Sequence, residues 1–150
     1  MIKVGDFAPN RSSRVRLSRL LKGKEVILCG ISALKYLELF NDEHFTEEDS
    51  IFVYATEMVK ANGFESNRLI VKRIDDFDAI DYNEDWEIAC STLNQVVNDM
   101  LSESELMNHD ALVESLANYY EDHGNFDEII VCETQEVMFD DLKALAMAFY

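Results

Sequence analysis

Residues 75–87 read DDFDAIDYNEDWE, in which seven of thirteen positions are carboxylates, with three aromatic residues between them. This density of carboxylates could hold a divalent cation, supply acid and base groups to a catalytic pocket, or present negative charge to a basic partner. As a calcium loop that starts at Asp76, the stretch fails twice. Its fifth position is Ile80, which has no ligand atom, and its sixth is Asp81, where the sharp turn needs a glycine.

Two interpretations of this acidic stretch remain open. It is either a solvated edge that is anchored to the core by Phe77, Ile80, Tyr82 and Trp86, or a surface that contacts an arginine-rich protein, because aromatic rings beside carboxylates suit such a contact. We take the second as the candidate partner-binding site. Its carboxylates are Asp75, Asp76, Asp78, Asp81, Glu84, Asp85 and Glu87.

Nucleophilic and metal chemistry find little support elsewhere in the chain. The three cysteines form no C-x-x-C pair and stand in apolar contexts, so we expect them to be buried and structural: Cys29, Cys90 and Cys132. The three histidines stand in acidic, polar contexts and share no local motif with a cysteine: His44, His109 and His123. Glycine-rich phosphate loops, H-E-x-x-H and G-x-S-x-G are absent. The sequence therefore predicts a protein that is not an enzyme and uses no metal or cofactor.

The segment VILCGISALKYLELF, residues 26–40, predicts a strand, a small-residue turn and a helix with Ser32 in the capping position. Nucleotidyltransferases seat a phosphate at such a turn, but they also need alternating carboxylates on the next strand to hold metal ions. Here the next strand is SIFVYAT, and Asp49 and Glu57 merely flank it. The turn is therefore expected without the transfer chemistry.

The elements that position these residues predict a single α/β domain. We expect three β-prone runs to form a small sheet: residues 26–29, 50–56 and 68–74. The sequence does not determine the order of these strands. The second half is helical, with a helix from Ser91 or Thr92 and another from about Asp110 that ends at Gly124. Residues 129–132 could add a strand. A last helix from about residue 134 is expected to face the core with Val137, Met138, Leu142, Leu145 and Phe149.

Charge divides the chain of 150 residues, whose formal charge is −17. Residues 1–24 form a basic N-terminal arm of charge +6, and residues 25–150 form an acidic domain of charge −23. Such a body repels nucleic acid, so direct binding of DNA or RNA is expected at most through the arm. The arm contains a predicted helix from about Ser13 to Lys22, which either docks on the acidic body or contacts a partner. No signal peptide or membrane span is recognisable, which predicts a cytoplasmic protein without membrane contact.

The order VILCGISALKYLELF, SIFVYAT, CSTLNQVVNDML and HDALVESLANYY resembles the C-terminal portion of AbiEi-type antitoxins over residues 26–120. These antitoxins are the partner proteins of nucleotidyltransferase toxins in abortive-infection systems. They also carry an N-terminal winged helix that binds their operator, in whose place this chain has only its basic arm. The resemblance implies a non-enzymatic protein of a phage-defence, counter-defence or mobile-element setting that acts on another factor.

Two function classes follow, both without catalysis. The first is an AbiEi-like interaction module that binds and inhibits a protein with a basic surface. The second is a decoy that imitates nucleic-acid phosphates and blocks a DNA- or RNA-binding enzyme, of the anti-restriction or anti-CRISPR type. A continuous band of carboxylates would favour the decoy, and scattered acids would favour the module. The partner and the oligomeric state are left open by the sequence.

Overall fold

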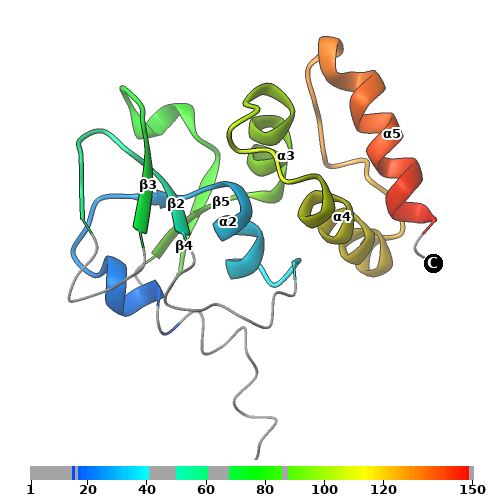
Figure 1. Cartoon of the computed structure of the whole chain (residues 1–150). Helices are drawn as coiled ribbons and strands as arrows, with labels where there is room; N and C mark the ends of the chain where they lie inside the picture. Colours follow the sequence, from blue (N-terminus) through cyan, green and yellow to red (C-terminus); the bar gives the residue numbers. More distant parts are fainter. Residues whose placement is uncertain (1–14, 16, 41–49, 61–67, 86–87, 149–150) are drawn as a thin grey trace, which may run out of the picture.

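The computed structural model describes residue 15 and residues 17–40, 50–60, 68–85 and 88–148. In this part of the chain, a small mixed sheet stands at one end of the molecule and the C-terminal helices extend away from it (Figure 1). The predicted single α/β domain is confirmed. No described helix combines the length and the apolarity that crossing a bilayer requires.

The described part of the sheet has five short strands in the order β3-β2-β1-β5-β4. They are β1 (Ile27–Leu28), β2 (Ser50–Ala55), β3 (Arg68–Arg73), β4 (Tyr82–Asp85) and β5 (Ile88–Ser91). Strands β1 and β5 pair in parallel, as do β2 and β3, whereas β1 with β2 and β4 with β5 are antiparallel. The three predicted strands are present with slightly shorter bounds. Strand β4 escaped prediction because an edge strand can keep polar side chains in water, so its sequence lacks an apolar pattern.

The helices follow the predicted order. They are α2 (Gly30–Tyr36), α3 (Leu93–Ser102), α4 (His109–His123) and α5 (Glu136–Met147), with the 3-10 turns η2 (Phe77–Ala79) and η3 (Glu133–Gln135). Residues 17–21 are also helical. Figure 1 shows α3, α4 and α5 in succession, with α5 farthest from the sheet.

Two of the predicted helix ends are confirmed by their hydrogen bonds. The Thr92 hydroxyl accepts from the backbone N–H of Gln95 (3.2 Å) and so caps the N-terminus of α3. Gly124 adopts a φ of 79° after the last turn of α4, a left-handed conformation that glycine enters at little cost. The expected cap at Ser32 is wrong. Helix α2 already starts at Gly30, and Ser32 Oγ instead accepts from the backbone N–H of Phe52 (2.9 Å), which ties α2 to β2.

The sheet carries a main core on one face and a smaller cluster on the other. The main core takes alternate side chains of the strands together with apolar residues of α2, α3, α4 and α5. Its leucines at positions 17, 20 and 21 come from the N-terminal helical residues and are at most 4% exposed. The described end of the basic arm therefore docks on the acidic body. The opposite face contributes Ile27, Cys29 and Tyr54, which pack with Leu106 from the turn after α3.

Two predictions about the last third of the chain are wrong. Residues 129–132 form no strand, because β4 and not this segment occupies the free edge beside β5. The predicted core stripe of α5 faces the core only through Leu142, whereas Val137, Met138 and Leu145 are 76%, 50% and 46% exposed. Helix α5 has α4 as its main described neighbour and buries only a narrow face: Phe139, Leu142 and Ala146. Phe149 lies outside the described residues.

Candidate functional site

The predicted acidic site lies along the β4 edge of the sheet. Five of its seven carboxylates are described and all are exposed: Asp75, Asp76, Asp78, Asp81 and Glu84. The side chain of Asp85, together with Trp86 and Glu87, lies outside the described side chains. Phe77 and Ile80 are half-buried and pack on the smaller cluster, as expected of anchors. The expectation for Tyr82 is wrong, because this side chain lies on the edge strand β4 and is 37% exposed.

Two of these carboxylates have structural contacts. Asp76 Oδ1 accepts from the backbone N–H of Asp78 (2.9 Å) and caps η2. Asp81 Oδ2 accepts from the Thr92 hydroxyl (2.8 Å), and the backbone N–H of Asp81 donates to Gln95 Oε1 (2.9 Å). Asp81 therefore joins the acidic stretch to the first turn of α3, which makes this edge partly a structural element.

A hollow of about 400 Å³ lies over β2 and β3 on the sheet side. Its lining combines Phe52, Ile70 and Leu106 with the cationic side chains of Lys72 and Arg73. Glu103 (3.2 Å) and Glu105 (2.5 Å) ion-pair with Lys72. The hydrogen bond that the Lys72 ammonium group donates to Glu105 is the main cause that raises the pKa of this ammonium group. Two carboxylates thus neutralise the most enclosed cation of this hollow.

Polar side chains lie beneath the turn that follows α3. Burial raises the pKa of the Cys29 thiol and of the Tyr54 hydroxyl far above their usual values, and the nearby Asp99 carboxylate adds to both shifts. The pKa of Asp99 is itself raised, chiefly by burial, although the Tyr54 hydroxyl and the Gln95 amide partly offset that effect. Cys29 is 0% exposed and packs in the smaller cluster of the sheet, as a small apolar core residue does.

The cysteine prediction is confirmed for two of three positions. Cys29 and Cys90 are buried, but Cys132 is exposed. The expectation for Cys132 was wrong because residues 129–132 form no strand that would turn this thiol inward. Within the described residues, no group of three or more histidine, cysteine or acidic side chains is placed to hold a metal ion.

A hollow of about 560 Å³ lies between α4 and α5. Its apolar lining comes from Val113 and Ala117 on α4 and from Leu145 on α5. Polar side chains along the same face of α4 surround this floor: His109, Asp110, Glu114, Asn118 and Glu121. We call this hollow the α4–α5 groove. It unites an apolar floor with a carboxylate rim.

The elements around the groove are firmly tied to the fold. The Asn118 amide donates to the backbone carbonyl of Leu39 (2.6 Å), which holds α4 against the chain that follows α2. On the other side, Phe139 of α5 meets Phe126 edge-on at 6.4 Å between ring centroids, and Leu142 is 2% exposed. Lys143 lies 4.8 Å above the Phe139 ring and 3.1 Å from Asp140. The groove is therefore bounded by two helices whose spacing is fixed by packing.

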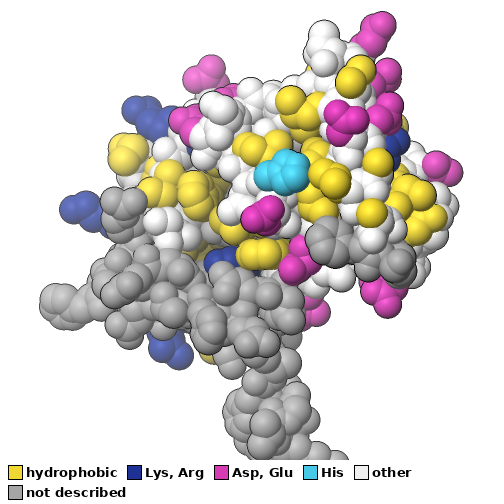
Figure 2. Space-filling view, turned by 45° about the vertical axis from the view of Figure 1, so that its right-hand side comes forward, with side chains coloured by type: hydrophobic (Ala, Val, Ile, Leu, Met, Phe, Trp, Pro, Cys, Tyr) yellow, Lys and Arg dark blue, Asp and Glu magenta, His cyan; other side chains and the backbone are white. Residues whose placement is uncertain are grey.

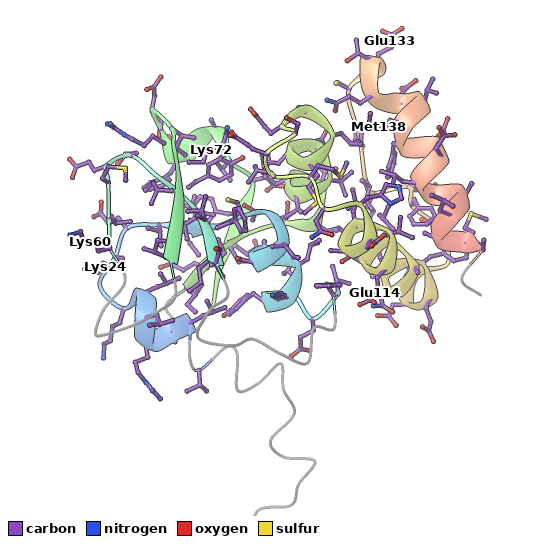
Figure 3. The ribbon with its side chains drawn as sticks, viewed as in Figure 1. Lys24, Lys60, Lys72, Glu114, Glu133 and Met138 are labelled. Atoms are coloured by element: carbon purple, nitrogen blue, oxygen red, sulfur yellow. The ribbon has the colours of Figure 1, made fainter. Side chains whose placement is uncertain are left out.

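The groove lies in the strongly acidic half of the chain. Residues 74–150 contain 20 of the 30 acidic residues and a single base, Lys143, so this half has a formal charge of −19, whereas residues 1–73 have a charge of +2. Figure 3 shows this separation: the labelled lysines lie on the sheet side, and Glu114 and Glu133 lie on the helical side. A basic molecule is therefore attracted to the end of the protein that carries the groove.

Apolar side chains also reach the surface around α5. The exposed large ones in this region are Ile130, Val137, Met138, Leu145 and Met147. In Figure 2, which views this side of the molecule, hydrophobic side chains form patches and the acidic ones stand between them as separate spots. Apolar patches rimmed by charge are typical of protein-binding surfaces. Sequence patterns pointed to the apolar residues of α5 but assigned them to the core.

Comparison with known family models, curated proteins and solved structures finds no match for this chain. The resemblance to AbiEi-type antitoxins therefore stays a prediction.

Proposed function

We propose that this protein is non-catalytic and acts by binding, and thereby inhibiting, another protein that has a basic surface. The observation that carries the proposal is the α4–α5 groove, where an apolar floor and a carboxylate rim lie in a half of the chain with charge −19. Apolar contact supplies affinity, and the carboxylates select a basic partner and speed its association. The acidic edge at β4 is a second negatively charged surface, and we propose that basic residues of the partner also contact it.

The groove favours an interaction module over a nucleic-acid decoy. A decoy must present charge at the regular spacing of phosphates, and exposed apolar residues contribute nothing to such a surface. In this protein Val137, Met138 and Leu145 stand among the acids of the C-terminal helices. We therefore rank the decoy second. The proposed biological setting is that of AbiEi-type antitoxins: phage defence, counter-defence or a mobile element.

Affinity capture tests this function. The tagged full-length protein is used as bait in lysate of cells that naturally carry it, at low and at high salt, and retained proteins are identified by mass spectrometry. We expect a partner with a basic surface whose retention falls as salt rises, because exposed ion pairs are screened beyond about 10 Å at 0.1 M salt. Reconstitution of the purified pair then checks direct binding.

Competition separates the two function classes. Added double-stranded DNA should leave the purified pair intact if the partner uses a protein-binding surface, and should displace this protein if it is a decoy that occupies a nucleic-acid site. The purified protein alone should show no nucleotidyltransferase, nuclease or protease activity. Metal-dependent nucleotide incorporation that Ser32→Ala abolishes would contradict the non-catalytic assignment.

A further inference from the structure

We infer that the α4–α5 groove binds one amphipathic α-helix of the partner, with the apolar face of that helix on the groove floor and its lysines or arginines along the rim of α4. This inference rests on the proposed function and specifies the form of the partner. It assigns the specific contact to the groove rather than to the β4 edge.

The floor of the groove is apolar: Val113 is 4% exposed and lies at its base, and Leu145 carries most of the exposed apolar surface. Val113 and Ala117 lie one turn apart on the same face of α4, and Leu145 faces them from α5. Leu145 is a large apolar side chain that is 46% exposed, and a docked apolar side chain would cover it.

The rim fixes the length and the charge of the bound helix. Asp110 and Glu121 are exposed carboxylates on one face of α4, eleven positions apart. At 1.5 Å per residue these carboxylates span about 16 Å, or three helical turns. A bound helix of at least three turns can therefore place basic residues against both ends of this rim, beside its apolar ridge.

Charge also decides between a foreign partner and a second copy of this chain. Docking of two copies through this surface would bring together two halves that each carry −19. The only base in that half, Lys143, is already engaged with Asp140 and the Phe139 ring. A basic foreign helix meets complementary charge instead, so heterologous binding is favoured.

The backbone of the groove favours a helix over an extended peptide. The helices α4 and α5, which supply all the described lining residues, bond their backbone N–H and C=O groups within each helix. The described lining of the groove therefore offers no strand edge to which an extended peptide could add. A bound helix forms the hydrogen bonds of its backbone N–H and C=O groups internally, so it contacts the groove through its side chains alone. An extended peptide would instead add to the edge strand β4. Variants of the groove residues distinguish binding in the groove from binding at that edge.

The test uses two synthetic peptides and pairs of matched variants. One peptide of about fifteen residues carries leucines at helical spacing with lysines on the other face, and the control peptide has the same composition without that periodicity. Binding to the full-length protein is measured by calorimetric titration. Leu145→Lys is paired with Met147→Lys, because both side chains are 46% exposed on α5 but only Leu145 lines the groove. Glu121→Lys is paired in the same way with Asp122→Lys, since both are exposed and only Glu121 lines the groove.

We expect the amphipathic peptide to bind at least about tenfold more tightly than its control peptide. Leu145→Lys and Glu121→Lys should each lower the affinity of the amphipathic peptide by about tenfold. The matched variants should stay within about twofold of wild type. Equal binding of the two peptides, no binding of either, or equal losses in the groove variants and their controls would overturn the groove assignment. Those results would leave the proposed function standing if salt-sensitive capture of a partner persists, whereas the loss of that capture would remove the function itself. Melting curves confirm that each variant is folded, and Glu121→Lys changes only an exposed side chain.

Discussion

Replacement of Asp81 by alanine should destabilise the protein, although this residue belongs to the acidic edge that the sequence predicts to bind a partner. Its Oδ2 accepts from the Thr92 hydroxyl at 2.8 Å, and Thr92 is the N-cap of α3. A hydrogen bond to a charged group contributes about 1.5–3 kcal/mol, and the exposed position of this pair lowers the expected loss to about 1–2 kcal/mol. For a chain of this size, that loss corresponds to a fall in Tm of about 2–8 °C.

Thermal melting followed by circular dichroism measures the effect, with Asp75→Ala as the matched control. Asp75 is an exposed carboxylate of the same stretch, so its replacement should change stability by at most about 0.5 kcal/mol. Equal melting of Asp81→Ala and wild type would refute the structural role of this contact. An equally large fall for Asp75→Ala would show that net charge, and not the link to α3, determines the effect.

Three further predictions concern stability and thiol access. Burial raises the folded-state pKa of Asp99 above its unfolded value, so the folded state binds the proton more tightly. The free energy of unfolding should therefore fall as pH rises from the unfolded pKa through the folded one. In urea melts at several pH values, Asp99→Asn should lose this dependence on pH, and an unchanged dependence would contradict the assignment. Gly124→Ala should cost about 1–2 kcal/mol because the φ of 79° strains a Cβ, and an unchanged Tm would refute this. A thiol reagent should label Cys132 at once in the native protein but Cys29 and Cys90 only after unfolding, so fast native labelling of Cys29 would be contrary to its burial.

Local signals in the sequence were sufficient for the helices of the second half. The Thr92 hydroxyl and the glycine at 124 act within one turn of the chain, so their residue types alone locate the ends of α3 and α4. The continuous apolar run of β2 likewise indicates a strand that is mostly buried, as Ile51, Val53, Tyr54 and Ala55 are. Ser32 shows the limit of such signals, because its hydrogen-bond partner is the backbone of Phe52 on a strand twenty residues away.

The surface of α5 could not be predicted, because periodicity shows which residues are apolar and not which of them a neighbour covers. Val137, Leu142 and Leu145 all look like core residues in sequence, yet α5 is the outermost helix and buries only the side of Leu142. The groove depends in the same way on the placement of Leu145 opposite Val113, a pair 32 positions apart in the chain. For the acidic edge, the sequence identified the exposed charges but could not show that Asp81 is bonded to Thr92.

Hydrogen–deuterium exchange of this protein alone and with its captured partner tests the central claim most directly. Binding in the α4–α5 groove should slow amide exchange in α4 and α5, over residues 109–123 and 136–147, and leave the β4 edge at residues 75–85 unchanged. Slowing that is confined to the β4 edge, or to the N-terminal residues 17–21, would contradict the groove as the functional surface.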